Sequence, residues 1–312
     1  MFIAKPLLKW VGGKAQIIDK IIDVFPKEIK GNYYEPFLGG GSVMLAFLSH
    51  VKHGTIRFDG MVYASDVNAS LVSVYKNVQK NGEEVINELQ KLMELHGNCA
   101  VDANATINRK ATNIDDALTS PESFYYRIRS QYNKMPKEDK CSPQGSAYFM
   151  FLNKTCFRGL YREGPNGFNV PYGNYKNPTI FTREHVLAIS VLIQNVVFRT
   201  APFSETIANT EHGDFVYLDP PYAPVNEASF VTYTKEGFDG TAHKLLFKAC
   251  DEMLARNVCF VMSNADVPMV QEHFNNTNVN IQVISCKRSI NSKKPESREN
   301  EVLIPTHCWC TR

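Results

Sequence analysis

The sequence lacks the features that mark several classes of protein. It has no run of 18 apolar residues, and its first residues show neither the apolar core nor the cleavage site of a secretion signal. We therefore expect a cytoplasmic protein without a membrane span, in a bacterium or in the host cell of a phage or virus. The net charge of +2 argues against a bulk polycation but leaves room for a local basic face.

Cysteine is present without a pattern that would use it. The eight cysteines form no C-x-x-C pair, so we expect reduced thiols in a cytosol-like compartment. His307, Cys308 and Cys310 lie close in the sequence, but no second pair with ligand spacing accompanies them, and we expect no metal site. The 44% apolar content, with 11% aromatics, suits a well-packed globule of 312 residues, either one large domain or a core with an inserted one.

The most informative segment is residues 214–222, an apolar strand that ends in Asp219-Pro220-Pro221-Tyr222. The exocyclic amine of a nucleobase is a poor nucleophile, because its lone pair is delocalised into the ring. Two acceptors that hold its hydrogens make the nitrogen more nucleophilic. The Asp219 carboxylate and the Pro220 carbonyl can be these acceptors, on a backbone fixed by two prolines. Tyr222 can then stack on the base. Taken alone, the tetrad could equally be a turn that closes a buried strand.

Two glycine-rich segments precede this strand. Residues 9–14, Lys-Trp-Val-Gly-Gly-Lys, open a helical pattern, and residues 33–42 read as strand, glycine loop and helix. Three glycines let the backbone approach a ligand, but the spacing is not that of a dinucleotide or phosphate loop. Residues 61–66 form a second strand pattern, and its terminal Asp66 could accept hydrogen bonds from a ribose or cap the helix that starts near Asn68.

Together and in this order, these segments resemble the N-terminal motif, the F-x-G-x-G loop, the acidic second strand and the D-P-P-Y strand of the Dam-like (D12 class, alpha-order) DNA adenine-N6 methyltransferases, which use S-adenosylmethionine. The resemblance covers nearly the whole chain. Other strings that carry it are Leu152-Asn153-Lys154, Arg158-Gly159-Leu160-Tyr161-Arg162, Phe168-Asn169-Val170-Pro171-Tyr172-Gly173, Tyr222-Ala223-Pro224, Ser263-Asn264 and Lys287-Arg288-Ser289-Ile290.

The resemblance implies a role for each motif. Site residues for the cofactor S-adenosylmethionine would be Trp10, Gly12, Gly13, Lys14, Phe37, Gly39, Gly41, Asp66 and Asp219. The catalytic residues would be Asp219, Pro220 and Tyr222, which receive an adenine flipped out of the duplex because a base pair hides its N6. Methyl transfer is then an in-line displacement that needs alignment more than a strong base, and it requires no metal and no covalent intermediate.

A stretch of about 150 residues separates Asp66 from Asp219, which is too long for an ordinary connection. We expect an inserted DNA-recognition domain there, with a helix and a hairpin over residues 153–175. The residues expected to contact double-stranded DNA are Lys9, Arg158, Leu160, Arg162, Asn169, Pro171 and Tyr175. Family members that read 5′-GATC-3′ carry Leu, Arg and Pro at the places of Leu160, Arg162 and Pro171, so we expect that site. Asn174 stands where the family often has a basic residue.

Three other segments receive simpler interpretations. Lys287 and Arg288 open a basic, Ser-rich segment that is typical of a clamp on the DNA backbone, or of a solvated loop. Residues 96–120 read as a flexible surface loop with no assignable task. The apolar spacing of Phe124, Ile128 and Tyr132 favours the core face of a helix over a base-stacking platform.

The fold we expect is α/β, a Rossmann-like class I methyltransferase sheet formed by residues 1–71 and 186–312. A mostly helical target-recognition domain with a β-hairpin, residues 72–185, interrupts it. The expected strands are residues 33–35, 62–65, 196–200, 215–218, 259–263 and 281–285, with the active site at their carboxyl ends. We expect a monomer, and a paired restriction endonuclease is compatible with the sequence.

Three alternatives remain open on the sequence alone. The first is a methyltransferase for another amino nitrogen, such as cytosine N4 or one in RNA or a protein amide, although Asp219 argues against it. The second is a sequence-specific DNA-binding protein without catalysis. The third, a nicotinamide-dependent oxidoreductase, conflicts with the glycine spacing.

Overall fold

The computed structural model describes residues 3–100, 107–224, 238–275, 277, 279–287 and 298–306. The chain divides into two compact units. The first, here called the sheet unit, comprises Met1–Ile3, Lys14–Val67 and Asn195–Arg312. The second, the helical unit, comprises Ala4–Gly13 and Asn68–Gln194.

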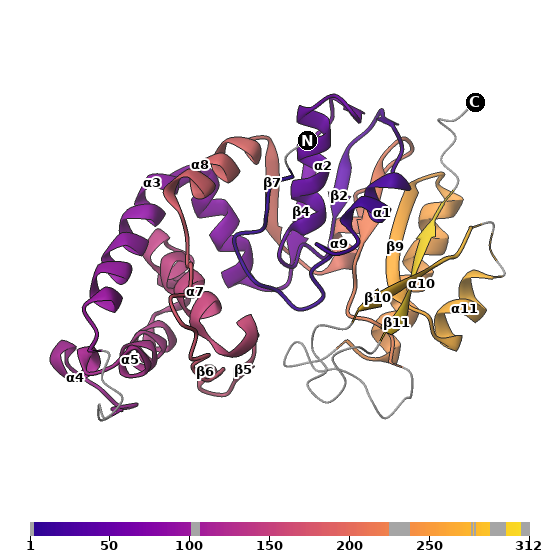
Figure 1. Ribbon diagram of the computed structural model, residues 1–312. Helices are drawn as coiled ribbons and strands as arrows, with labels where there is room; N and C mark the ends of the chain where they lie inside the picture. The colour runs from indigo at the N-terminus through magenta and orange to yellow at the C-terminus, as the bar shows by residue number, and fades with distance from the viewer. Residues whose placement is uncertain are drawn as a thin grey trace. The chain divides into compact units, whose positions relative to one another are not determined.

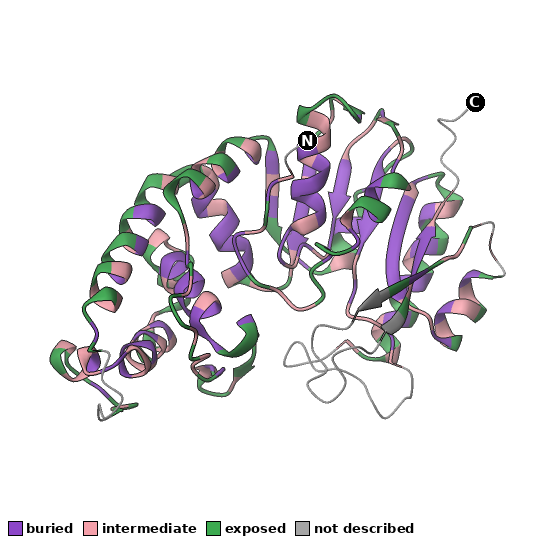
Figure 2. Cartoon of the chain, viewed as in Figure 1, coloured by how far each residue is buried: buried purple, intermediate pink, exposed green. Residues whose placement is uncertain are grey.

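The sheet unit is organised by a seven-stranded sheet of order β10-β11-β9-β8-β2-β4-β7 (Figure 1). Its strands are β2 (Tyr33–Glu35), β4 (Val62–Asp66), β7 (Val196–Thr200), β8 (Phe215–Leu218), β9 (Cys259–Ala265), β10 (Gln282–Lys287) and β11 (Arg298–Pro305). The run from β9 to β7 is parallel, whereas β11 lies antiparallel between β9 and β10. All residues of β2 and β8 are buried, as expected of central parallel strands (Figure 2).

This topology confirms the expected mixed α/β fold and agrees with a class I methyltransferase sheet. The six expected strands are present, and β2, β7 and β8 have the expected bounds. The seventh strand, β11, was missed, because its first half, Arg298–Glu301, is polar and only residues 302–304 are a buried apolar run. A strand of this kind gives a weak pattern until its pairing partners are known.

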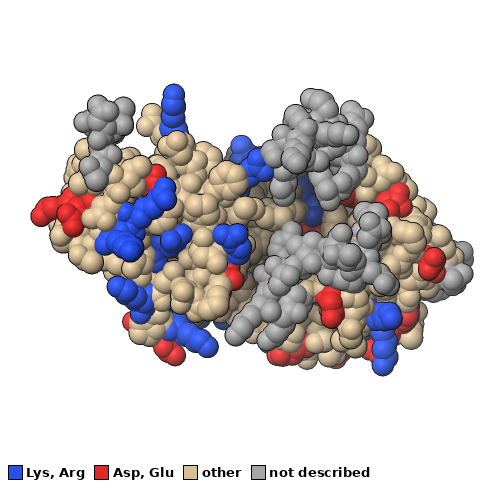
Figure 3. Space-filling view, turned by 90° about the horizontal axis from the view of Figure 1, so that it is seen from below, with Lys and Arg blue, Asp and Glu red and all other residues tan. Residues whose placement is uncertain are grey.

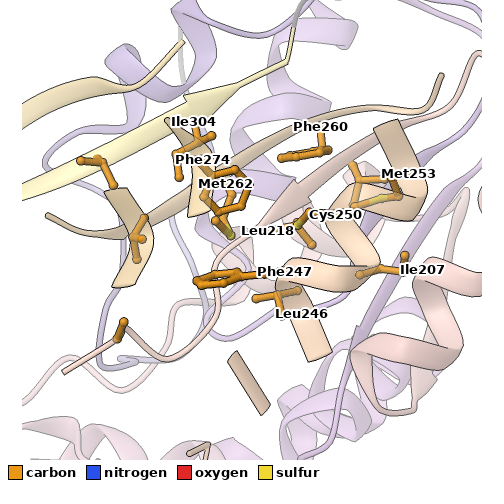
Figure 4. Packing of buried hydrophobic residues seen from close by; sticks show 14 of the residues in the cluster. Ile207, Leu218, Leu246, Phe247, Cys250, Met253, Phe260, Met262, Phe274 and Ile304 are labelled. Carbon is orange, nitrogen blue, oxygen red and sulfur yellow. The ribbon is translucent and has the colours of Figure 1, made fainter. Parts of the chain in front are cut away.

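Helices and a hydrophobic cluster hold the sheet in shape. The helices of this unit are α1 (Ile18–Asp23), α2 (Ser42–Lys52), α9 (Phe203–Ala208), α10 (Gly240–Ala255) and α11 (Pro268–Phe274), and a small parallel pair joins β1 (Glu28–Ile29) to β3 (Arg57–Phe58). Figure 4 shows Leu218 and Met262 of the sheet packed with Phe247 of α10 and Phe274 of α11. Each such side chain stabilises the fold by about 1.5–3 kcal/mol, so β8 is firmly anchored.

The helical unit is built around a long helix. Its elements are α3 (Ala69–Gly97), α4 (Ile114–Leu118), α5 (Pro121–Lys134), α6 (Lys137–Lys140), α7 (Pro143–Thr155), the 3-10 helix η1 (Phe157–Gly159), the strands β5 (Glu163–Gly164) and β6 (Gly167–Phe168), and α8 (Arg183–Leu192). Strands β5 and β6 form the expected hairpin. On α5, Phe124, Ile128 and Tyr132 are buried, which confirms that this stripe is core packing.

Residues 96–120 are not the uninterrupted loop that the sequence suggested. Helix α3 extends to Gly97, and α4 forms at residues 114–118. The side chain of Asn113 caps α4 by accepting a hydrogen bond from the Asp116 N–H at 2.8 Å. A five-residue helix is too short to show a periodic pattern, which is why sequence reasoning missed it.

Candidate active site and nucleic-acid-binding residues

The glycine loop connects β2 to α2 and is tied to the end of β4. Gly39 and Gly41 have φ values of 47° and 71°, in the left-handed region that glycine adopts most easily. The Gly39 N–H donates to Asp66 Oδ2 at 3.0 Å. Helix α2 begins at Ser42 without a side-chain cap, since Gly41 occupies the N-cap position. The predicted loop residues and Asp66 are therefore brought together at the carboxyl ends of two neighbouring parallel strands.

Phe37 contributes an aromatic surface beside this loop. Its ring stacks on Phe203 at a centroid distance of 5.3 Å and meets Phe238 edge-on at 5.8 Å. His243 lies edge-on to Phe238 at 4.8 Å, and burial lowers the pKa of His243 to about 4. The imidazole is therefore neutral at physiological pH and acts as part of this apolar wall rather than as a cation.

Asp219 forms an ion pair with Lys14. Lys14 Nζ lies 2.8 Å from Asp219 Oδ1, and the lysine side chain is only 4% exposed. The Lys14 backbone N–H donates to Ser42 Oγ at 3.3 Å, so the residue is also fixed to the start of α2. Burial raises the pKa of Asp219, and the adjacent ammonium opposes that rise. Because the carboxyl group remains 20% exposed and has a cation beside it, we expect it to be ionised at neutral pH.

Tyr222 is held by contacts from two directions. Its hydroxyl donates to Glu301 Oε2 on β11 at 2.8 Å, and Lys14 Nζ lies 4.9 Å from the centroid of its ring. The next residue, Ala223, donates its N–H to Asn264 Oδ1 at 3.0 Å. Sequence reasoning did not assign these supporting roles to Glu301 and Asn264.

Glu35 is a buried acid beside the same site. It is 2% exposed and accepts a hydrogen bond from the Tyr33 hydroxyl at 2.6 Å. Burial above all, with a smaller contribution from the negative charge of Asp219, raises the pKa of Glu35 to about 8. Sequence reasoning missed this residue too. The available signal was an acid at the end of an apolar strand, directly before the glycine loop.

A neighbouring cavity of the sheet unit is distinct from these residues. It measures about 210 Å³ and lies against β4, β7 and α9, with Tyr63, Arg199 and Glu205 among its lining residues. The glycine loop, Lys14 and Asp219 do not line it. The candidate active site is therefore defined by its side chains and backbone geometry and not by this cavity.

In the helical unit, residues 9–13 are attached to α7 and to the 3-10 helix that follows it. Asn153 is buried, accepts a hydrogen bond from the Lys9 N–H at 2.8 Å and donates to the Lys9 carbonyl at 2.8 Å. Trp10 stacks on Tyr161 at 5.4 Å. Gly159 has φ +63°, and a Cβ there would lie 2.5 Å from Lys9 Cβ, so a glycine is required on both counts. Gly12 also has a positive φ, and the Gly13 N–H bonds back to the Trp10 carbonyl.

Two of the predicted DNA-contacting residues pair with each other across the hairpin. Arg162 Nε donates to Asn169 Oδ1 at 2.6 Å, and the Asn169 N–H donates to the Arg162 carbonyl at 3.0 Å. Asn133 of α5 bonds to both the N–H and the carbonyl of Phe168, which fixes β6 to the helix. Arg162 and Asn169 are both exposed, so the hairpin presents them to solvent from a rigid support.

The other predicted residues surround this hairpin. Arg158 is exposed and has φ 56°, the Pro171 carbonyl accepts the Phe157 N–H, and Leu160 is half-buried. Lys9 Nζ lies 4.3 Å from the centroid of the Tyr175 ring. Lys154 lies near Lys9, and burial together with the charge of Lys9 lowers the pKa of Lys154 to about 8. Figure 3 shows Lys and Arg side chains gathered on the visible face of the helical unit.

Some residues named from the sequence lie outside the described ranges. Arg288 and the candidate ligands His307, Cys308 and Cys310 lie there, and Lys287 is described only as the last backbone position of β10. Among the described residues, no group of three or more His, Cys, Asp or Glu could hold a metal ion. Within those same ranges, no helix is both long and apolar enough to cross a membrane.

Comparison with known proteins identifies the chain. A model of the D12 class N6 adenine-specific DNA methyltransferase family matches residues 10–290. The chain belongs to this family. The resemblance inferred from the sequence is thereby confirmed, and this methyltransferase is an enzyme that modifies adenine in DNA.

Curated relatives match over almost their entire length. The type II methyltransferase M.MjaIII of Methanocaldococcus jannaschii is 35% identical over 309 residues, which cover 96% of this chain and 98% of the relative. The type II methyltransferase M1.LlaDCHI of Lactococcus lactis is 29% identical, over 97% of this chain and 95% of its own. DNA adenine methylase of Escherichia coli K12 is 28% identical, over 96% and 94%. The similarity therefore includes both units of the methyltransferase.

The raised pKa of Glu35 leads to a prediction about stability. Between the ordinary value of 4.5 and the value of about 8, the folded protein binds more protons at this site than the unfolded chain. The free energy of unfolding therefore falls as the pH rises through this window. Glu35→Gln removes the ionisation and should raise the free energy of unfolding, relative to wild type, by on the order of 1–3 kcal/mol at pH 8.5, with a smaller gain at pH 5.

Urea denaturation of both proteins at the two pH values measures this difference. The control is Glu28→Gln, which removes a partly exposed acid on β1 that pairs with Arg57 and should give a difference that does not change with pH. A pH-independent difference for Glu35→Gln as well would mean that Glu35 is ionised in the folded protein.

Proposed function

We propose that this methyltransferase transfers a methyl group from S-adenosylmethionine to N6 of an adenine flipped out of double-stranded DNA, within the sequence 5′-GATC-3′. The observation that carries the proposal is the tetrad Asp219 to Tyr222, directly after β8 and with its acid paired to Lys14. We further propose that residues 1–71 and 186–312 act as the catalytic domain and residues 72–185 as the target-recognition domain.

The residues of the sheet unit fit the proposed methyl donor. Gly39 and Gly41 leave the backbone of the loop open to close approach, and α2 begins there without a side-chain cap. Asp66 contributes a carboxylate with which to bind a ribose hydroxyl, and Phe37 adds an apolar ring. When bound, the donor supplies a methyl group carried on a sulfonium, and the amine displaces the sulfur of this sulfonium in line. From the helical unit we assign Trp10, Gly12 and Gly13 to the same cofactor, on family resemblance.

The catalytic residues act on the target amine. The Asp219 carboxylate and the Pro220 carbonyl accept its two hydrogens and draw the nitrogen towards tetrahedral geometry. The ring of Tyr222 stacks on the flipped base. The proton leaves for solvent after transfer, because a carboxylate with an ordinary affinity for protons cannot first deprotonate an aryl amine.

The GATC assignment rests on the hairpin of the helical unit. Arginine reads guanine through two hydrogen bonds in the major groove, and Arg162 is exposed at the base of the hairpin. Leu160 and Pro171 provide apolar contacts, and Lys9 supplies a positive charge beside Tyr175. Lys287 and Arg288 would add contacts to the DNA backbone.

Mapping modified bases tests the reaction and the specificity together. After incubation with S-adenosylmethionine and unmethylated plasmid, we expect N6-methyladenine only within GATC.

A substitution at Asp219 tests the catalytic role of the tetrad. Asp219→Ala should lower kcat by at least about 100-fold, because one acceptor of the transition state is lost, while duplex binding is retained. Thermal unfolding of the variant is the control, since Lys14 loses the charge of its partner. Unchanged methylation by Asp219→Ala would refute the catalytic role of Asp219.

Arg162 is predicted to determine specificity. Arg162→Ala should relax discrimination at one guanine of the site by about 1–3 kcal/mol, measured as the ratio of kcat/KM for cognate and single-substitution duplexes. Arg109→Ala removes another exposed arginine of the helical unit, one that pairs with Glu122, and should leave this ratio unchanged. An equal loss on every duplex would show that Arg162 contacts phosphates instead.

Lys154 is predicted to make DNA binding depend on pH. Its pKa of about 8 reflects burial and the nearby Lys9, and an anion bound to both residues would favour the protonated form. Affinity for duplex DNA should therefore be constant well below pH 8 and decline as the pH rises through about 8 and above.

Fluorescence anisotropy between pH 6.5 and 9.5 measures the decline. Lys154→Arg keeps the charge over this whole range and should flatten the profile. Lys176→Arg, at an exposed position of the same unit, should keep the wild-type profile. A profile that is identical for wild type and Lys154→Arg would exclude Lys154 from the DNA contact.

A further inference from the structure

The aromatic ring of the tetrad needs support that its own backbone does not give. Two prolines fix φ before Tyr222, but the side chain of Tyr222 still rotates about χ1 and χ2. A ring that stacks on a flipped base must be held near one orientation, because small misplacements of reacting groups are costly in rate. The residues that hold the ring therefore bear on catalysis.

The hydroxyl of Tyr222 is anchored on the C-terminal part of the sheet. It donates to Glu301 Oε2 at 2.8 Å. Glu301 lies within β11, where it pairs with Ala265 of β9 on one side and with Ile284 of β10 on the other. The following residue, Val302, is fully buried. The acceptor is therefore fixed by strands on both sides and is not part of a loop.

A second contact fixes the ring itself. Lys14 Nζ lies 4.9 Å from the ring centroid and also pairs with Asp219, so the ammonium occupies one face of the ring and the opposite face is the one on which a base would stack. A phenol that donates to a carboxylate gains electron density in its ring, which strengthens attraction to positive charge at the ring face. Such charge develops on the amine nitrogen as it accepts the methyl group.

We propose that Glu301 is a positioning residue for methyl transfer, which holds the Tyr222 ring in the orientation that receives the flipped adenine. The inference rests on the proposed function, since it assigns a role within that reaction. Glu301 touches neither the base nor the reacting atoms in this role; it acts through the tyrosine hydroxyl.

Steady-state kinetics on a GATC duplex tests the pair. We expect Glu301→Ala and Tyr222→Phe each to lower kcat by about 10-fold, with little change in KM for the donor. The double variant should be no slower than either single one, because both changes remove the same hydrogen bond. Glu301→Gln retains an acceptor oxygen and should recover most of the rate.

A spectroscopic signal separates positioning from simple stabilisation of the fold. With 2-aminopurine in place of the target adenine, a flipped base that stacks on Tyr222 is quenched, so Glu301→Ala should give brighter fluorescence than wild type. Asn300→Ala is the matched control: it changes the adjacent, exposed residue of β11, which bonds to Asp266, and should leave both kcat and fluorescence unchanged.

The outcomes are distinct. If the wild type methylates adenine while Glu301→Ala keeps wild-type kcat and fluorescence, or if the two single effects multiply in the double variant, the positioning role is wrong and the proposed function stands. If the wild type methylates no adenine, the proposed function fails and this inference fails with it. Should Glu301→Ala not fold, the comparison of Tyr222→Phe with Glu301→Gln still decides, because both variants keep a full side chain at position 301 of β11.

Discussion

The ion pair between Lys14 and Asp219 is the interaction on which the rest of the site depends. An ammonium that is only 4% exposed is costly unless an anion lies beside it, and Asp219 Oδ1 does so at 2.8 Å. The charge of Lys14 is thereby compensated by Asp219. Glu35, buried and without a cation of its own among its described contacts, responds with a pKa raised to about 8 and is mostly neutral at physiological pH. In the proposed reaction, Asp219 is thus the ionised acid of the tetrad that accepts a hydrogen of the amine.

Support for the tetrad comes from segments that are far apart in the sequence. Strand β8 places Asp219, Lys14 fixes its carboxylate, Asn264 fixes the backbone after Tyr222, and Glu301 fixes the tyrosine hydroxyl. Parallel pairing brings the carboxyl ends of β2, β4 and β8 to one edge of the sheet, where the loop and Asp66 meet. Strand β11, which pairs antiparallel with β9 and β10, carries Glu301. Through Glu301 this strand orders the side chain of Tyr222, which the two prolines leave free to rotate.

The sequence predicted the strands and motifs of the site better than the hydrogen bonds between distant residues that hold it. Strands β2 and β7 begin with aromatic or apolar residues and β8 is apolar throughout. The glycine loop and the tetrad carry chemistry in adjacent residues, so local reasoning found all of them. The Tyr222 to Glu301 bond joins residues 79 positions apart, and it requires a register between strands that no local pattern encodes. Asn153 illustrates the same limit: a polar residue in an apolar helix indicates a buried hydrogen bond, but not that its partner is the backbone of Lys9.

The DNA recognition proposed for the helical unit would draw on order that the hairpin already has. Asn133 fixes β6 to α5, and the Tyr125 hydroxyl donates to the Val170 carbonyl at 2.7 Å. Arg162 is in turn held against Asn169 by a hydrogen bond of 2.6 Å. A long side chain that is already restricted loses less rotamer freedom on contact with a base, so less of the binding free energy is spent on ordering it. The hairpin can therefore be short, with two residues in each strand, because α5 and the preceding turn supply its rigidity.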